Sequence, residues 1–268
     1  MEFVEDVKEK LKMKVPHNTC LIFVTHQLDD DIIQYIKYLK SSACGIMDFY
    51  VLYDSAHGVR KAGMTENVKV WDFDSDNIIG FFHQRDKRLP NPLVLLCLFA
   101  KTHPYNHYML MENDIVLKGD FHKFLNTIND NNEYDYIHIE TDKLGGPEHH
   151  WPILYIKDSP FEWIYFAWCQ IFYVSRRYLQ DLDTFTQVNH TFYYEFLLPT
   201  MAYNNTCKYK IRSFESLGYS FDISWGPTEE YEKRYAEGTR DNIFYHPVKN
   251  LNAVKSGPNI METGHKQQ

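Results

Sequence analysis

Continuous apolar runs alternate with helical patterns through the first half of the chain. Four runs have the length and apolar content of buried strands: residues 20–25, 48–53, 68–73 and 107–111. The residues after the first run place Ile32, Ile33, Ile36 and Leu39 on one helix face, behind three aspartates that suit a helix N-terminus. Residues 92–101, opened by a proline, and 121–128 predict two further helices. This alternation predicts βαβ units, and hence a parallel sheet with helices on both faces.

The helical rhythm weakens after residue 140. The pattern predicts three strands and one helix: a strand at 134–140, a strand at 168–175, a helix at 191–203 and a strand at 208–214. We expect this second half to elaborate the same sheet, so that residues 18–254 form a single α/β domain with a mixed, mostly parallel sheet. Residues 1–17 are expected to form a helical extension, and residues 255–268 a flexible tail.

Composition narrows the functional classes. The 268 residues are 44% apolar, which is enough for a sizeable core. Lys and Arg number 28 against 36 Asp and Glu, giving a net charge of −8. An acidic chain argues against a nucleic-acid partner, because binding phosphates requires a basic face. Aromatic residues make up 16%, which fits either an aromatic-rich core or a cleft that stacks sugars or bases.

Cysteine usage and hydropathy suggest a compartment. The five cysteines are scattered and never spaced as C-x-x-C, which argues for a reducing environment. The longest uncharged apolar run, 92–100, is too short to cross a bilayer, and residues 1–15 lack the apolar region of a signal peptide. We therefore expect a cytoplasmic protein without a transmembrane segment. The sequence leaves its oligomeric state open.

Polar residues gather where the predicted strands end. In open α/β sheets, ligands bind beyond the carboxyl ends of the strands. The residues predicted there, as contacts to a nucleotide cofactor or donor, are Thr25, His26, Tyr53, Asp54, Asp72 and Asn113. The dinucleotide, P-loop, nucleophile-elbow and zinc-protease motifs are absent, so those enzyme classes are disfavoured.

The strongest chemical signal is Glu112-Asn113-Asp114, where an apolar strand runs directly into two carboxylates. Carboxylates at i and i+2 can face one hard cation if the chain turns between them, and Mn²⁺ or Mg²⁺ could then bridge to a diphosphate. The alternative is a solvated acidic turn after a strand.

The position of this motif, behind three βα elements, resembles that of the metal-binding DXD motif in nucleotide-sugar glycosyltransferases of the GT-A (Rossmann-like) fold. The segment HYMLMENDIVLKGDFHKFL is also similar to a motif of the DUF3405-like group. Glu112 departs from the first Asp of that pattern, so Asp114 carries over more securely. The resemblance implies a nucleotide-binding half at 18–140 and an acceptor-binding half at 141–254.

The resemblance extends to two later segments. Near the C-terminus, His246-Pro247-Val248-Lys249 resembles the place where GT-A enzymes return a histidine to the metal, with a basic residue on the diphosphate. This implies His246 as a third ligand and Lys249 as a diphosphate contact; the alternative is a surface turn. Glu195, between Tyr194 and Phe196, resembles the acceptor-side acid of inverting enzymes, and desolvation by these rings would raise its pKa toward that of a general base. The alternative is an exposed glutamate.

Three tryptophans are candidates for stacking an acceptor sugar: Trp151, Trp163 and Trp225. Trp168, inside the predicted strand 168–175, is assigned to the core.

Together these features predict a metal-dependent glycosyltransferase, hexosyl or pentosyl and inverting. It would move a sugar from a UDP- or GDP-linked donor to a hydroxyl of a glycan. Two alternatives are a non-catalytic carbohydrate-binding module and a metal-dependent phosphoesterase, which would need two cations and more converging ligands.

Overall fold

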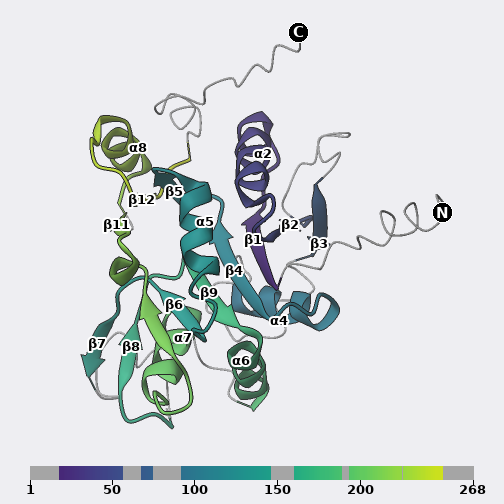
Figure 1. Ribbon diagram of the computed structural model, residues 1–268, viewed down its shortest axis with the longest axis vertical. Coiled ribbons are helices and arrows are strands. Elements are labelled where there is room, and N and C mark those ends of the chain that lie inside the picture. Colours follow the sequence, from purple (N-terminus) through teal and green to yellow (C-terminus); the bar gives the residue numbers. More distant parts are fainter. Residues whose placement is uncertain are drawn as a thin grey trace, which may run out of the picture.

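A seven-stranded sheet forms the centre of the molecule, in the order β10-β6-β9-β4-β1-β2-β3 (Figure 1). The computed structural model describes residues 18–56, 68–74, 92–145, 160–188, 193–224 and 226–249. The strands of the central sheet are β1 (Thr19–Thr25), β2 (Asp48–Asp54), β3 (Lys69–Phe73), β4 (His107–Glu112), β6 (Tyr136–His138), β9 (Ile171–Ser175) and β10 (Ile211–Ser213).

Parallel pairing dominates this sheet. β1 pairs in parallel with β2 and β4, β2 with β3, and β6 with β10. β9 is the exception, antiparallel to both β4 and β6. The predicted α/β domain with a mixed, mostly parallel sheet is therefore confirmed.

Helices cover both faces of the sheet and create two cores. Helices α2 (Asp30–Ala43) and α5 (Phe121–Asn129) pack against Leu21 and Phe23 of β1 on one face. Helices α4 (Pro92–Thr102), α6 (Arg176–Val188) and α7 (Tyr194–Tyr203) pack with Cys20 and Ile22 on the other. A strand buried on both faces needs apolar residues at successive positions, which is why β1 reads as an unbroken apolar run.

The predicted helix start after β1 is confirmed. The Asp29 side chain caps α2 by accepting a hydrogen bond from the Ile32 backbone N–H at 2.9 Å, and Asp30 and Asp31 occupy the first turn. These carboxylates satisfy an otherwise unpaired amide and complement the positive end of the helix dipole.

A second, three-stranded sheet is built from segments far apart in the sequence. Its strands, in the order β11-β12-β5, are β11 (Ser220–Ile223), β12 (Ile243–His246) and β5 (Val116–Lys118). Helix α8 (Thr228–Glu237) connects β11 to β12. After β5 the chain approaches Asn242 so closely that a Cβ on Gly119 would lie 3.0 Å from the Asn242 backbone nitrogen, and Gly119 also has a φ of +144°. Glycine is the residue that suits this approach and this conformation.

The second half of the chain differs from its prediction in several places. The strand predicted at 168–175 begins at Ile171, and half-buried Trp168 precedes it, packed edge-on against Phe166. The strands predicted at 134–140 and 208–214 are three-residue segments, and the described part of the helix predicted at 191–203 begins at Tyr194. Elements that the pattern did not predict are β5, β7 (Asp142–Gly145), β8 (Ile164–Phe166), α6, η3 (Glu215–Leu217), β11, α8 and β12.

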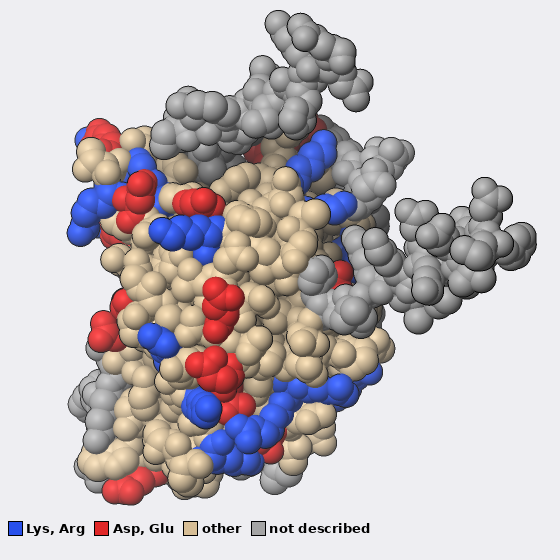
Figure 2. All heavy atoms as spheres, in the orientation of Figure 1, with Lys and Arg blue, Asp and Glu red and all other residues tan. Residues whose placement is uncertain are grey.

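Charged side chains of both signs are interspersed over the face of the molecule shown in Figure 2, and a band of basic side chains crosses its lower part. Among the helices in the described residues, none combines the length and the apolar character needed to cross a lipid bilayer.

Candidate metal centre

The carboxyl ends of four adjacent strands meet at one edge of the sheet. The strand register pairs Val24 of β1 with Glu112 of β4, Thr25 with Tyr53 of β2, and Tyr53 with Asp72 of β3. This edge is where ligands bind in open α/β sheets. The structure therefore brings the predicted donor-binding and metal-binding positions to the same edge.

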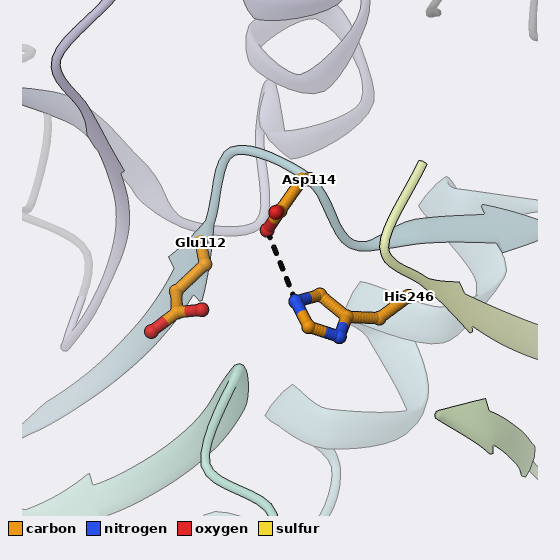
Figure 3. Close-up of side chains that lie close together, drawn as sticks. All are labelled: Glu112, Asp114 and His246. Carbon is orange, nitrogen blue, oxygen red and sulfur yellow. Dashed lines mark ion pairs between the residues drawn. The ribbon is translucent and has the colours of Figure 1, made fainter. Parts of the chain in front are cut away.

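Glu112, Asp114 and His246 converge there (Figure 3). One potential ligand atom from each residue lies within 4.8 Å of the other two, and all three side chains are partly buried. His246 Nε2 lies 3.2 Å from Asp114 Oδ1. Glu112 ends β4, Asp114 follows in the turn, and His246 ends β12. Among the residues that the structure describes, this is the one such cluster.

Strand pairing explains why a histidine so distant in sequence arrives beside Asp114. β12 runs antiparallel to β5, with Tyr245 opposite Val116, so His246 comes level with the turn that carries Asp114. The Val248 backbone N–H donates to the Asp114 carbonyl at 2.8 Å and fixes the chain beyond the histidine. On the other side of the turn, the Tyr35 hydroxyl donates to the Ile115 carbonyl at 3.1 Å.

The donor set fits a divalent cation. Ligands held about 2.1 Å from Mg²⁺ are at most about 4.2 Å apart, so a small movement would bring these three atoms into coordination distance. Two carboxylate oxygens and one imidazole nitrogen suit Mn²⁺, whereas Mg²⁺ prefers an all-oxygen set. Buried His246 Nδ1 has no hydrogen-bond partner, so Asp114 at Nε2 is the group that orients the ring in the protein alone.

Burial perturbs the electrostatics of Glu112. Burial, followed by the nearby Asp114 carboxylate, raises its pKa to about 8, while His246 acts in the opposite direction. Two carboxylates that approach each other without a cation repel, so one of them holds a proton more tightly. Glu112 thus carries a proton at neutral pH in the metal-free protein, and a cation that bound here would displace it.

Glu195 lies in the first turn of α7 and is buried, with 1% of its surface exposed. The interpretation of this residue as an exposed glutamate is therefore wrong. Burial raises its pKa to about 7, the direction predicted from its aromatic neighbours. The Gln170 side chain donates to Glu195 Oε1 at 3.4 Å. A carboxylate with this pKa can exchange a proton at neutral pH.

These two pKa shifts predict how stability depends on pH. A carboxyl whose pKa is higher in the folded than in the unfolded chain stabilises the fold at low pH, and this contribution is lost as the pH rises through the folded pKa. In metal-free protein we expect the free energy of unfolding to fall between about pH 5 and pH 8 as Glu195 and Glu112 ionise, by about 1.4 kcal/mol for each unit of pKa shift, and the urea midpoint to fall with it. Glu112→Gln should flatten part of this decline, whereas Glu133→Gln, at an exposed site, should not. A midpoint that rises over this range would contradict the assignment.

The residues predicted to bind the nucleotide lie at the same edge but differ in burial and in hydrogen bonding. Thr25 is buried, and its hydroxyl both donates to the Gln27 carbonyl and accepts from the Gln27 N–H, so it shapes the turn after β1. Asp54 is also buried and accepts a hydrogen bond from the Ala56 N–H at 3.1 Å. Tyr53 is buried beside it.

The remaining predicted contacts lie closer to solvent. His26 and Asp72 are exposed at the ends of β1 and β3, and Asn113 is half-buried between the two acidic ligands. Lys249 has an exposed side chain, and its backbone N–H donates to the Glu232 side chain of α8 at 3.1 Å. Contact of these residues with a donor stays a prediction.

Of the three tryptophans proposed to stack an acceptor sugar, the structure describes Trp163. Trp163 is 38% exposed and is held by two hydrogen bonds between its backbone and Asn204, which immediately follows α7. Glu195 lies at the opposite end of this ten-residue helix, which is about 15 Å long. Trp163 therefore lies about one helix length from Glu195, and its contact with an acceptor stays a prediction. Trp151 and Trp225 lie outside the described residues.

Two polar residues that were not predicted complete the site. Gln170 precedes β9, its carbonyl accepts from the Glu112 N–H at 2.8 Å, and its buried side-chain oxygen has no hydrogen-bond partner. The Tyr194 hydroxyl donates to Glu112 Oε1 at 3.2 Å. A polar residue at the start of a strand antiparallel to β4 is the signal that could have identified Gln170.

No protein-family model matches the sequence, and no curated protein does. Among solved structures, a variant of the galactosyltransferase LgtC is 11% identical, with a TM-score of 0.48 over 91% of this chain and 98% of that one. Core-mannan synthase A from Aspergillus fumigatus, in a Mn/GDP form, is 11% identical, with a TM-score of 0.42 over 75% of this chain and 74% of that one. A cytidylyltransferase from Leptospira borgpetersenii is 12% identical, with a TM-score of 0.42 over 74% and 75% of the two chains. The case for function therefore rests on the site itself.

Proposed function

We propose that this protein is a metal-dependent glycosyltransferase of the GT-A type. It would transfer a sugar from a nucleoside diphosphate, UDP- or GDP-linked, to a hydroxyl of a glycan. The observation that carries the proposal is the convergence of Glu112, Asp114 and His246 at the carboxyl edge of the sheet, with the buried Glu195 on the adjacent helix. The similarity to the DUF3405-like group stays a prediction.

In this proposal the three ligands hold Mn²⁺ or Mg²⁺, and the imidazole favours Mn²⁺. When bound, the cation neutralises charge that develops on the leaving diphosphate. Lys249, three residues beyond His246, would add a positive charge on the same group. Thr25, His26, Tyr53, Asp54, Asp72 and Asn113 would line the nucleoside side of the edge.

Glu195 would take the proton of the acceptor hydroxyl as that oxygen attacks the sugar. Its pKa of about 7 provides a fraction of ionised carboxylate at neutral pH together with enough basicity to accept the proton. Direct attack by the acceptor inverts the anomeric configuration, which is the outcome we propose. The buried, unpartnered oxygen of Gln170 offers an acceptor to a hydroxyl of the transferred sugar.

Calorimetric titration with UDP and GDP, with and without Mn²⁺, tests the proposal. One of the two nucleotides is expected to bind in a Mn²⁺-dependent manner, and His246→Ala should weaken that binding because it removes the nitrogen ligand. His122→Ala is the matched control, since His122 is exposed on α5. Metal-independent binding of glycans, with no nucleotide binding, would favour a carbohydrate-binding module instead.

A further inference from the structure

The first turn of α7 reaches the candidate metal centre through one hydroxyl group. Tyr194, the first residue of α7, is 5% exposed and donates from its hydroxyl to Glu112 Oε1 at 3.2 Å. Its ring packs edge-on against Tyr193, with the ring centroids 4.8 Å apart. Because the ring is buried among other side chains, the hydroxyl has little freedom to point elsewhere.

A carboxylate that binds a cation through one oxygen leaves its other oxygen available to a second partner. Figure 3 shows one oxygen of Glu112 turned toward His246 and the other turned away. A neutral donor on a carboxylate fixes the plane of the group without competing for the cation. Tyr194 has the properties of such a donor: one directional proton, no charge and a rigid ring.

We propose that Tyr194 is the residue that positions Glu112 for metal binding. This inference rests on the proposed function, since it assigns a role within the same centre. Tyr194 immediately precedes the buried Glu195 in the first turn of α7. The first turn of α7 therefore carries both the hydroxyl that contacts the proposed metal ligand and the proposed base.

Tyr178 provides a matched control for a purely structural effect. It is a fully buried tyrosine of α6 whose hydroxyl donates to the Leu198 carbonyl of the same helix α7. Replacing either tyrosine by phenylalanine removes one buried hydroxyl that holds α7. Only the Tyr194 substitution removes a contact with Glu112.

The test is a titration of the full chain with Mn²⁺ alone, in which free Mn²⁺ is measured by electron paramagnetic resonance. Tyr194→Phe is expected to bind Mn²⁺ about tenfold more weakly than the wild type, the usual effect of removing a hydrogen-bond partner of a metal ligand. Tyr178→Phe should keep the wild-type affinity. In a Glu112→Gln background, Tyr194→Phe should cause no further loss, because the group that it positions is already altered.

Two results would overturn this role. The first is that folded Tyr194→Phe keeps the wild-type Mn²⁺ affinity while Asp114→Asn loses Mn²⁺ binding. In that case the metal centre would stand, but Tyr194 would not position Glu112 in it. The second is that Tyr194→Phe lowers the Mn²⁺ affinity by the same factor with and without the Glu112→Gln substitution. If wild type and Asp114→Asn bind Mn²⁺ equally weakly, the metal centre itself is wrong, and the proposed function fails with it.

Discussion

Glu195→Gln is expected to reduce turnover by about 10²–10⁴-fold, the usual contribution of a general base. The amide has the same shape as the carboxyl group and can still hydrogen-bond to Gln170, but it cannot accept a proton from the acceptor hydroxyl. Binding of donor and acceptor should therefore change little. In the wild type, activity should also decline as the pH falls through about 7, where the carboxylate becomes protonated. The measurement is the initial rate of transfer with an identified donor and acceptor.

Glu215→Gln is the matched control for this variant. Glu215 is another carboxyl whose pKa burial raises, but it lies in η3 and accepts a hydrogen bond from the Glu140 backbone N–H. Its substitution should leave turnover unchanged. Near-normal turnover in Glu195→Gln would remove this residue from the mechanism, and retention of the anomeric configuration in the product would exclude its role as base in a direct displacement.

Asp114→Asn is expected to weaken Mn²⁺-dependent nucleotide binding by about 10²–10³-fold. Two unit charges about 4 Å apart attract each other by about 4 kcal/mol at an effective dielectric constant of 20, which corresponds to about 10³ in affinity. The asparagine oxygen can still accept the proton of His246 Nε2, so the local geometry is kept while the charge is removed. Calorimetry with nucleotide at fixed Mn²⁺ measures the effect.

Asp130→Asn removes the same charge from an exposed site at the end of α5 and should bind as the wild type does. Both variants should have similar thermal midpoints without metal. If Asp114→Asn retained full Mn²⁺-dependent affinity, neither the ligand assignment nor the proposed function that depends on it could stand.

The first half of the fold could be predicted because its strands are buried on both faces. Each of β1, β2 and β4 is a long apolar segment, and helix α2 carries its own cap at Asp29. These signals are local, so they do not depend on knowing which strands pair.

The second half was harder because its elements are short or mostly polar. β5, β8 and β10 have three residues each, which is too few to show a period. Helix α8 is charged along most of its length and buries only Tyr231 and Tyr235. Helix α6 is different: Tyr178, Leu179 and Leu182 have helical spacing, and that signal could have been used.

For the candidate site, sequence reasoning proposed Glu112, Asp114 and His246 as ligands, and the structure brings these three residues together, but the sequence did not show how they meet. Glu112 and Asp114 follow a strand, so their place at the edge of the sheet could be inferred from the pattern. His246 came from family resemblance alone, because the pairing of β12 with β5 joins segments that no local pattern connects. The contact from Tyr194 to Glu112 likewise depends on packing between α7 and β4.

The pairing of β12 with β5 also sets an order of events during synthesis. Glu112 and Asp114 leave the ribosome early, and almost half of the chain must follow before His246 can join them. The central strands β1, β2 and β4 can pair in the meantime, since domains fold as the chain emerges. A nascent chain released before β12 would present two carboxylates without their imidazole. In the proposed function, a cation could therefore meet all three ligands only after β12 has been made and has paired with β5.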